Sequence, residues 1–94
     1  MRKIEVTTAF RRDFKRESKG AHRAILDTAL KQVIAALAGD RPLPAKYHDH
    51  ALTGNWKAYR DCHVRPDLVL IYRHAENPRR LVLARLGSHS ELDL

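Results

Sequence analysis

The sequence predicts one α+β domain, in which a small, mainly antiparallel sheet packs against an αα-hairpin. Apolar residues follow the 3.6-residue period of helices over residues 8–38, and the two-residue period of strands after residue 56. Two prolines at 42 and 44 separate these halves, because proline disfavours both helices and central strands. A chain of 94 residues builds one hydrophobic core, so we expect residues 1–94 to form a single domain.

The first forty residues predict a strand and then two helices. Apolar and polar residues alternate over residues 3–7, which is typical of a short strand. Thr7 or Thr8 can cap a following helix, and the run at 18–20 ends it. A second helix is expected over residues 22–38, before a glycine that favours a helix end. Its apolar stripe comprises Leu26, Leu30, Val33 and Leu37.

The second half predicts three strands joined by tight turns. We expect strands over residues 56–64, 68–73 and 80–86, separated by turns at 65–67 and 75–78. The last two strands are almost continuously apolar, which indicates that they are central and covered by the helices. The predicted order is therefore β-α-α-β-β-β.

The chain is strongly basic, with a formal net charge of +7. Residues 1–46 contribute +6 (eleven Lys and Arg against five Asp and Glu), and residues 47–94 contribute +1 (seven against six). This excess predicts a polyanionic partner, either a nucleic acid or an acidic protein segment. The longest apolar stretch, residues 68–72, is far too short for a membrane span, and the N-terminus has no apolar signal-like segment. We expect a cytoplasmic protein that does not bind membranes.

Cys62 is the only cysteine, so neither an intrachain disulfide nor a cysteine-based zinc site can form. Cys62 is next to His63 in sequence, but adjacent strand residues point to opposite faces. We therefore expect Cys62 to be a core residue and not a nucleophile.

Groups that titrate near neutral pH gather in the second half, in loops and at strand ends. His50 precedes the sheet, His63 lies near the end of one expected strand, and His89 follows the last. Asp67 begins the strand after His63, and a tight turn at 65–66 would bring the two within hydrogen-bond reach. Functional groups commonly occupy such positions on a rigid sheet.

Two kinds of chemistry suit this set of residues. A metal site could use the pair His48 and His50 with His63 or His89, although an isolated H-x-H pair is a weak signal. Cleavage of RNA without a metal is the stronger hypothesis. One group would remove the ribose 2′-hydroxyl proton, and another would protonate the 5′-oxygen that leaves. Histidine suits both transfers because its ordinary pKa of about 6.5 lies near neutrality.

The stretch 43–67 carries the long pattern D-H-x-L-x-G-x-W-K-x-Y-R-D-x-H-x-x-P-D. L-I-Y-R follows, and a closing L-G-S-H ends at His89. In these motifs the chain resembles the YafQ branch of the RelE/ParE superfamily of bacterial type II toxins. Such a resemblance implies a RelE-like fold and an mRNA interferase, an endoribonuclease that enters the ribosomal A site and cuts the translated message without a metal or other cofactor.

The resemblance also implies site residues and partners. His50, His63, Asp67 and His89 match the catalytic groups of the family, and Asp93 stands where the family usually has an aromatic residue. The expected partners are the ribosome with its mRNA and an acidic antitoxin of the DinJ/RelB type. Independently of the resemblance, the cations expected to contact RNA are Lys46, Lys57, Arg60, Arg65 and Arg85.

Two other functions are compatible with parts of the sequence. The superfamily contains toxins that poison DNA gyrase, and these lack the catalytic groups. A non-catalytic RNA-binding module would account for the charge alone. Cleaved translated mRNA, trapped gyrase–DNA complexes, or neither would distinguish the three.

Overall fold

The computed structural model describes all residues 1–94 and confirms the predicted α+β fold. The strands are β1 (Lys3–Val6), β2 (His50–Ala51), β3 (Arg60–Arg65), β4 (Leu68–Ala75) and β5 (Arg80–Gly87). The helices are α1 (Thr8–Glu17), α2 (Arg23–Leu26) and α3 (Ala29–Ala38), with short 3₁₀ turns η1 (Ala45–Tyr47) and η2 (Gly54–Trp56). None of the helices is long and apolar enough to cross a membrane.

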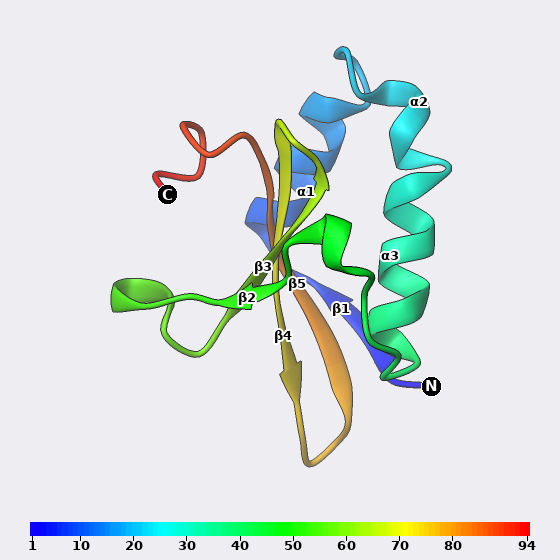
Figure 1. Ribbon diagram of the computed structural model, residues 1–94, viewed down its shortest axis with the longest axis vertical. Helices are drawn as coiled ribbons and strands as arrows, with labels where there is room; N and C mark the ends of the chain where they lie inside the picture. Colours follow the sequence, from blue (N-terminus) through cyan, green and yellow to red (C-terminus); the bar gives the residue numbers. More distant parts are fainter.

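The sheet has five strands in the order β1-β5-β4-β3-β2. β5 pairs with β1 in parallel, and every other neighbouring pair is antiparallel. The helices connect β1 to the rest of the chain and cover one face of the sheet (Figure 1). The layered arrangement leaves the other face to be covered only by loops and the C-terminal segment.

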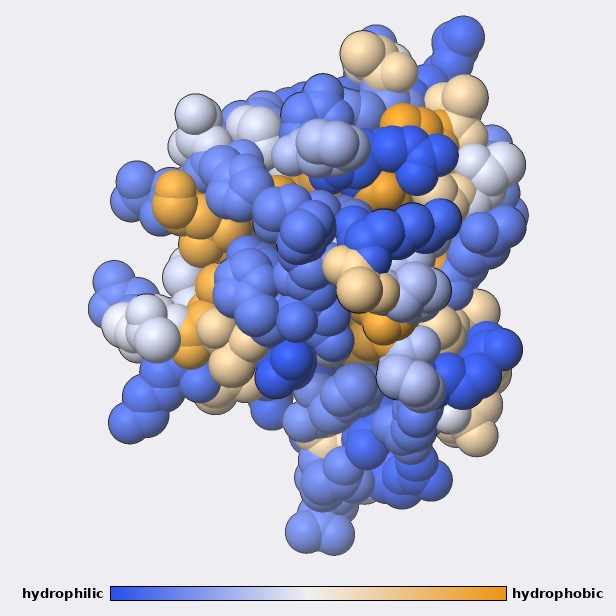
Figure 2. Space-filling model, viewed as in Figure 1, coloured by the Kyte–Doolittle hydropathy of each residue, from blue (hydrophilic) through white to orange (hydrophobic).

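Each face of the sheet has its own apolar cluster. The larger cluster joins the helices to the sheet through residues such as Leu30, Val33, Leu70 and Leu81, which are at most 1% exposed. The smaller cluster lies on the other face and consists of Val69, Ile71, Ala84 and Leu92. Leu92 therefore fixes the C-terminal segment on the face that the helices leave uncovered. Figure 2 shows that polar residues cover most of the visible surface, with apolar residues in small separate areas between them.

The start of α1 agrees with the sequence. The Thr7 hydroxyl accepts a hydrogen bond from the backbone N–H of Phe10 at 2.9 Å and donates one to the Ala84 carbonyl at 2.7 Å. A capping threonine satisfies one of the free N–H groups at a helix start. Thr7 thus caps α1 and also ties it to β5.

The single helix expected over residues 22–38 is wrong. α2 ends at Leu26 and α3 begins at Ala29, with Thr28 between them at φ −122° and ψ −85°. The Thr28 hydroxyl donates to the Ala24 carbonyl at 3.3 Å. Threonine and aspartate compete for backbone groups in this way, which explains why the apolar stripe continues while the helix is interrupted.

The strand expected over residues 56–64 also differs. β3 begins at Arg60, and residues 54–56 form η2 instead. Trp56 and Tyr59 pack edge to face, with ring centroids 5.1 Å apart, beside the smaller cluster. The two-residue strand β2 was not predicted, because a strand of that length has no detectable period.

A β-bulge lies near the end of β3. His63 pairs with Val69 and Arg65 pairs with Leu68, so Val64 is the extra residue. Without it, Arg65 would share a face with His63. Leu68 belongs to the helix-side cluster, and residues paired across a ladder share a face, so the bulge moves Arg65 to the helix side.

Candidate active site

Four histidines gather on the face of the sheet that the helices leave uncovered. They come from the loop after η1 (His48), β2 (His50), β3 (His63) and the segment after β5 (His89). The ring centroid of His63 lies 5.4 Å from that of His48, 6.5 Å from that of His50 and 4.9 Å from that of His89. His63 is therefore the centre of the cluster. We call these four residues the histidine cluster.

The hydrogen bonding of His50 determines which of its nitrogens is free to react. Its Nδ1 lies 2.8 Å from the carbonyl oxygen of His48. A carbonyl only accepts, so Nδ1 carries the proton and Nε2 is left free. The His50 side chain is 54% exposed, so Nε2 can reach a substrate. His48 adopts the left-handed backbone conformation at φ 49°, which turns its carbonyl toward His50.

Asp61 lies beneath the cluster, paired with His50 across the β2–β3 ladder. The residue is only 2% exposed, and its Oδ1 is 3.1 Å from Nδ1 of His50. Oδ1 nevertheless has no hydrogen-bond partner, because the Nδ1 proton of His50 points to the His48 carbonyl. Burial raises the pKa of Asp61, while the charges of His50, His63 and His89 act in the opposite direction. Sequence reasoning missed Asp61, although its two-residue spacing from His63 placed both on one strand face.

His63 is arranged to be neutral near pH 7. Burial lowers its pKa, and repulsion from His89, His48 and His50 lowers it further, against the attraction of Asp61. A neutral imidazole can accept a proton. His63 thus has the protonation state that a general base requires.

Asp67 is not where the sequence suggested. The prediction that His63 and Asp67 form a hydrogen bond is wrong. Asp67 instead pairs with His22, and the distance from Nε2 of His22 to Oδ1 of Asp67 is 3.0 Å. His22 belongs to the loop between α1 and α2, and the Asp67 side chain is 73% exposed. The turn at 65–67 extends beyond the sheet to the helical layer, which sequence spacing does not reveal.

The five cations expected to contact RNA differ in how they are engaged. Arg85 makes two hydrogen bonds to Asp13 of α1, at 2.7 and 3.3 Å, and Arg60 donates to Asp49 at 3.2 Å. These two guanidinium groups already support the fold. No carboxylate pairs with the remaining three, which are Lys46, Lys57 and Arg65.

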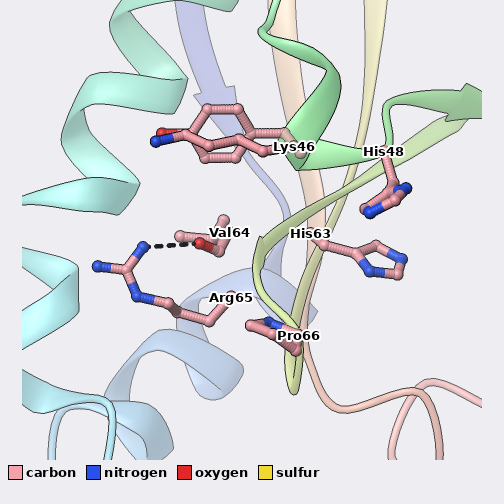
Figure 3. Close-up of a pocket in the computed structure, with 7 residues that line it drawn as sticks. Lys46, His48, His63, Val64, Arg65 and Pro66 are labelled. Carbon is pink, nitrogen blue, oxygen red and sulfur yellow. Dashed lines mark hydrogen bonds between the residues drawn. The ribbon is translucent and has the colours of Figure 1, made fainter.

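Lys46 and Arg65 line a pocket beside the histidine cluster, between η1 and the β3–β4 turn. His48 and His63 form one side of this pocket, which has a volume of about 260 Å³. Figure 3 shows Arg65 extending toward the helices while His63 points to the opposite side of β3. We call this space the Lys46–Arg65 pocket.

The sequence also raised a metal site and a cysteine nucleophile as alternatives, and the positions of the side chains test both. No three His, Cys, Asp or Glu side chains are arranged closely enough to hold a metal ion. Cys62 is fully buried in the helix-side cluster, and burial raises its pKa, so it is a core residue as predicted.

Comparisons with known proteins identify the family to which the chain belongs. Residues 2–94 match the model of a family described as the bacterial toxin of a type II toxin–antitoxin system, YafQ. The mRNA interferase toxin YafQ of Escherichia coli K12 is 39% identical over 92 residues, covering 97% of this chain and 95% of its own. The chain is thus a type II toxin, and it belongs to the YafQ family.

Solved structures agree with the fold. A metal-bound toxin from Helicobacter pylori superposes with a TM-score of 0.84 at 40% identity, covering 98% of this chain and 99% of the other. The E. coli DinJ–YafQ complex gives a TM-score of 0.80 at 37% identity, with 98% of each chain covered.

Proposed function

We propose that this protein is a ribosome-dependent mRNA endoribonuclease that cuts translated messages by acid–base catalysis without a metal. The observation that carries the proposal is the histidine cluster, in which His63 has a lowered pKa and His50 presents a free Nε2. The E. coli relative bears the name mRNA interferase, which supports the same activity here.

In this mechanism His63 is the general base. Its neutral imidazole takes the proton of a ribose 2′-hydroxyl, and the oxygen then attacks the adjacent phosphorus. The new P–O bond gives a pentacoordinate phosphorane whose equatorial oxygens carry the negative charge. A general base positioned in this way contributes about 10²- to 10⁴-fold to the rate.

His50 is the general acid. Its Nε2, when protonated, gives a proton to the 5′-oxygen as the P–O bond to that oxygen breaks, leaving a 2′,3′-cyclic phosphate and a 5′-hydroxyl. An imidazolium at His50 would place its charge 3.1 Å from Asp61. The buried carboxylate therefore acts through His50, as a positioning residue that places a negative charge beside the ring.

His89 lies against His63 and supplies a further group near the phosphorane. Asp67 remains a predicted catalytic residue, but its contact with His22 places it outside the hydrogen bonds of the cluster. We therefore assign the two proton transfers to His63 and His50.

An acidic antitoxin is the proposed protein partner. The E. coli relative has been solved in complex with DinJ. A formal charge of +7 on this chain favours a partner segment of the opposite sign. Such a segment would neutralise the surface that otherwise meets the ribosome.

Cleavage on a programmed ribosome tests the proposal. Purified protein should cut the message in the A site, with 5′ ends mapped by primer extension, and the rate should not fall with EDTA at a concentration that leaves ribosomes intact. A rate that vanishes with EDTA and returns with zinc would establish a metal mechanism instead. Trapped gyrase–DNA complexes without cut mRNA would overturn the proposal.

A further inference from the structure

We propose that the Lys46–Arg65 pocket binds a backbone phosphate of the message, one nucleotide away from the phosphate that is cleaved. This inference rests on the proposed function, because it assigns a binding site for the same RNA substrate.

The pocket concentrates positive charge that the fold does not use. Six arginines form ion pairs with carboxylates, namely Arg2, Arg16, Arg60, Arg79, Arg80 and Arg85. Lys46 and Arg65 form none, and both line the same pocket of about 260 Å³. Two unpaired cations in one concave site attract an anion.

The β-bulge in β3 aims Arg65 into this pocket. Its Nη1 donates to the Val64 carbonyl at 3.0 Å, which holds the guanidinium while its other N–H groups remain free. A guanidinium held in this way loses less entropy when it binds a phosphate through two hydrogen bonds. The ring of Pro66 at the next position restricts the backbone of the turn.

His63 connects the pocket to the reacting centre. His63 lines the pocket, and its imidazole forms the middle of the histidine cluster on the other side of β3. β2 pairs with β3 only at Arg60 and Asp61, so the outer edge of β3 beyond them has no neighbouring strand. RNA that places one phosphate at the cluster can cross this edge and place the next between Lys46 and Arg65 (Figure 3).

Short 2′-O-methyl RNAs test the pocket without cleavage, because they have no 2′-hydroxyl to attack. A dinucleotide has one bridging phosphate and a trinucleotide has two. We expect the trinucleotide to bind the wild-type protein about tenfold more tightly, as measured by NMR titration, because the second phosphate gains charge-assisted hydrogen bonds. The Lys46→Gln/Arg65→Gln double variant should bind both RNAs equally.

Arg41→Gln is the matched control. Arg41 also lacks an ion pair but does not line the pocket, so this variant should keep the tenfold difference. A difference that persists in the double variant, or is lost equally in Arg41→Gln, would overturn the proposal. The proposal would also be overturned if the double variant kept the difference in affinity between the two RNAs and lost only its binding to an acidic antitoxin peptide. The pocket would then bind a protein carboxylate.

The two proposals can fail separately. Wild-type protein that does not cut ribosome-bound mRNA, yet shows the difference between the two RNAs, would contradict the endoribonuclease and leave the pocket intact. Normal cleavage by the double variant would overturn the phosphate-binding proposal and leave the endoribonuclease proposal standing. If both hold, the double variant should cut about tenfold or more slowly at limiting ribosome concentration, with an unchanged pH profile.

Discussion

His22 bridges two carboxylates: its Nε2 lies 3.0 Å from Asp67 and its Nδ1 lies 3.0 Å from Glu17. The ring thereby joins the loop after α1 to the β3–β4 turn. Only a protonated imidazole has an N–H for both carboxylates. The hydrogen bond to Glu17 is the main cause that raises the pKa of His22; burial opposes it and the contact with Asp67 adds to it.

This bridge predicts a pH-dependent contribution to stability. Because the pKa of His22 is higher in the folded state, the contribution is complete below the unfolded value of about 6.5 and is lost as pH rises through the folded value. His22→Gln should lower the melting temperature by about 2–5 °C near pH 6 and much less near pH 9. Thermal unfolding of both proteins at the two pH values measures this.

Asp67→Asn provides the control for that experiment. In an Asp67→Asn background, His22→Gln should have a smaller effect, because one of the two contacts is already lost. Equal effects of His22→Gln in both backgrounds would show that Asp67 is not coupled to His22 in solution.

Single-turnover cleavage should depend on pH in a bell-shaped manner. The rate should rise through the pKa of His63, which lies below its ordinary value, because the base must be deprotonated. It should fall again as the acid loses its proton. His63→Gln should slow cleavage by about 10²- to 10⁴-fold and remove the rising limb, and His50→Gln should remove the falling limb.

His74→Gln is a suitable comparison for these variants. His74 lies outside the cluster, with its Nε2 3.0 Å from the Leu37 carbonyl. This variant should keep the bell shape and nearly the full rate. Near wild-type rates for both His50→Gln and His63→Gln would contradict the assignment of His63 as the base and His50 as the acid.

Asp61→Asn should separate stability from activity. The raised pKa of Asp61 means that its ionised form destabilises the folded state at neutral pH. The variant should therefore melt at the same or a higher temperature at pH 7, and any gain should shrink as pH falls toward about 4. Cleavage should slow by about 10- to 100-fold, because His50 loses the nearby negative charge.

Circular dichroism and the rate assay measure the two effects of Asp61→Asn on one preparation. A variant that melts at a much lower temperature and cleaves slowly would indicate a purely structural role. Rescue of the rate by Asp61→Glu would support the charge as the cause.

The basic surface of α1 should govern salt dependence. Arg11, Arg12 and Lys15 are exposed and unpaired, whereas Arg16 contacts Asp13, Glu17 and Glu91. Replacing Arg11, Arg12 and Lys15 with Gln should reduce the slope of log affinity against log salt by up to about 0.7 per lost phosphate contact. Binding to ribosomes at several salt concentrations measures the slope, and an unchanged slope would show that this face does not contact RNA.

The periodicity and turn residues of the sequence predicted much of the fold. The apolar stripe of residues 22–38, the runs of β4 and β5, and Thr7 as a cap all depend on residues close together in sequence. The same kind of local reasoning placed Cys62 in the core, because strand faces alternate.

Local patterns could not predict the interruption at Thr28 or the short strand β2. At Thr28 a side-chain hydroxyl donates to a backbone carbonyl four residues earlier, which the continuous apolar stripe does not reveal. β2 depends on only two residue pairs with the distant strand β3. The β-bulge at Val64 belongs with these features, and it reverses the side to which Arg65 points.

The candidate site divides in the same way. The sequence by itself identified His50, His63 and His89 as candidate site residues, and the tertiary structure brings them together on one face with His48. Only the tertiary structure shows that Asp61 lies beneath His50 and that Asp67 pairs with His22. The reason is physical: residue type and spacing determine which face of a strand a side chain occupies, whereas its partners come from distant segments that meet only when the sheet and helices pack.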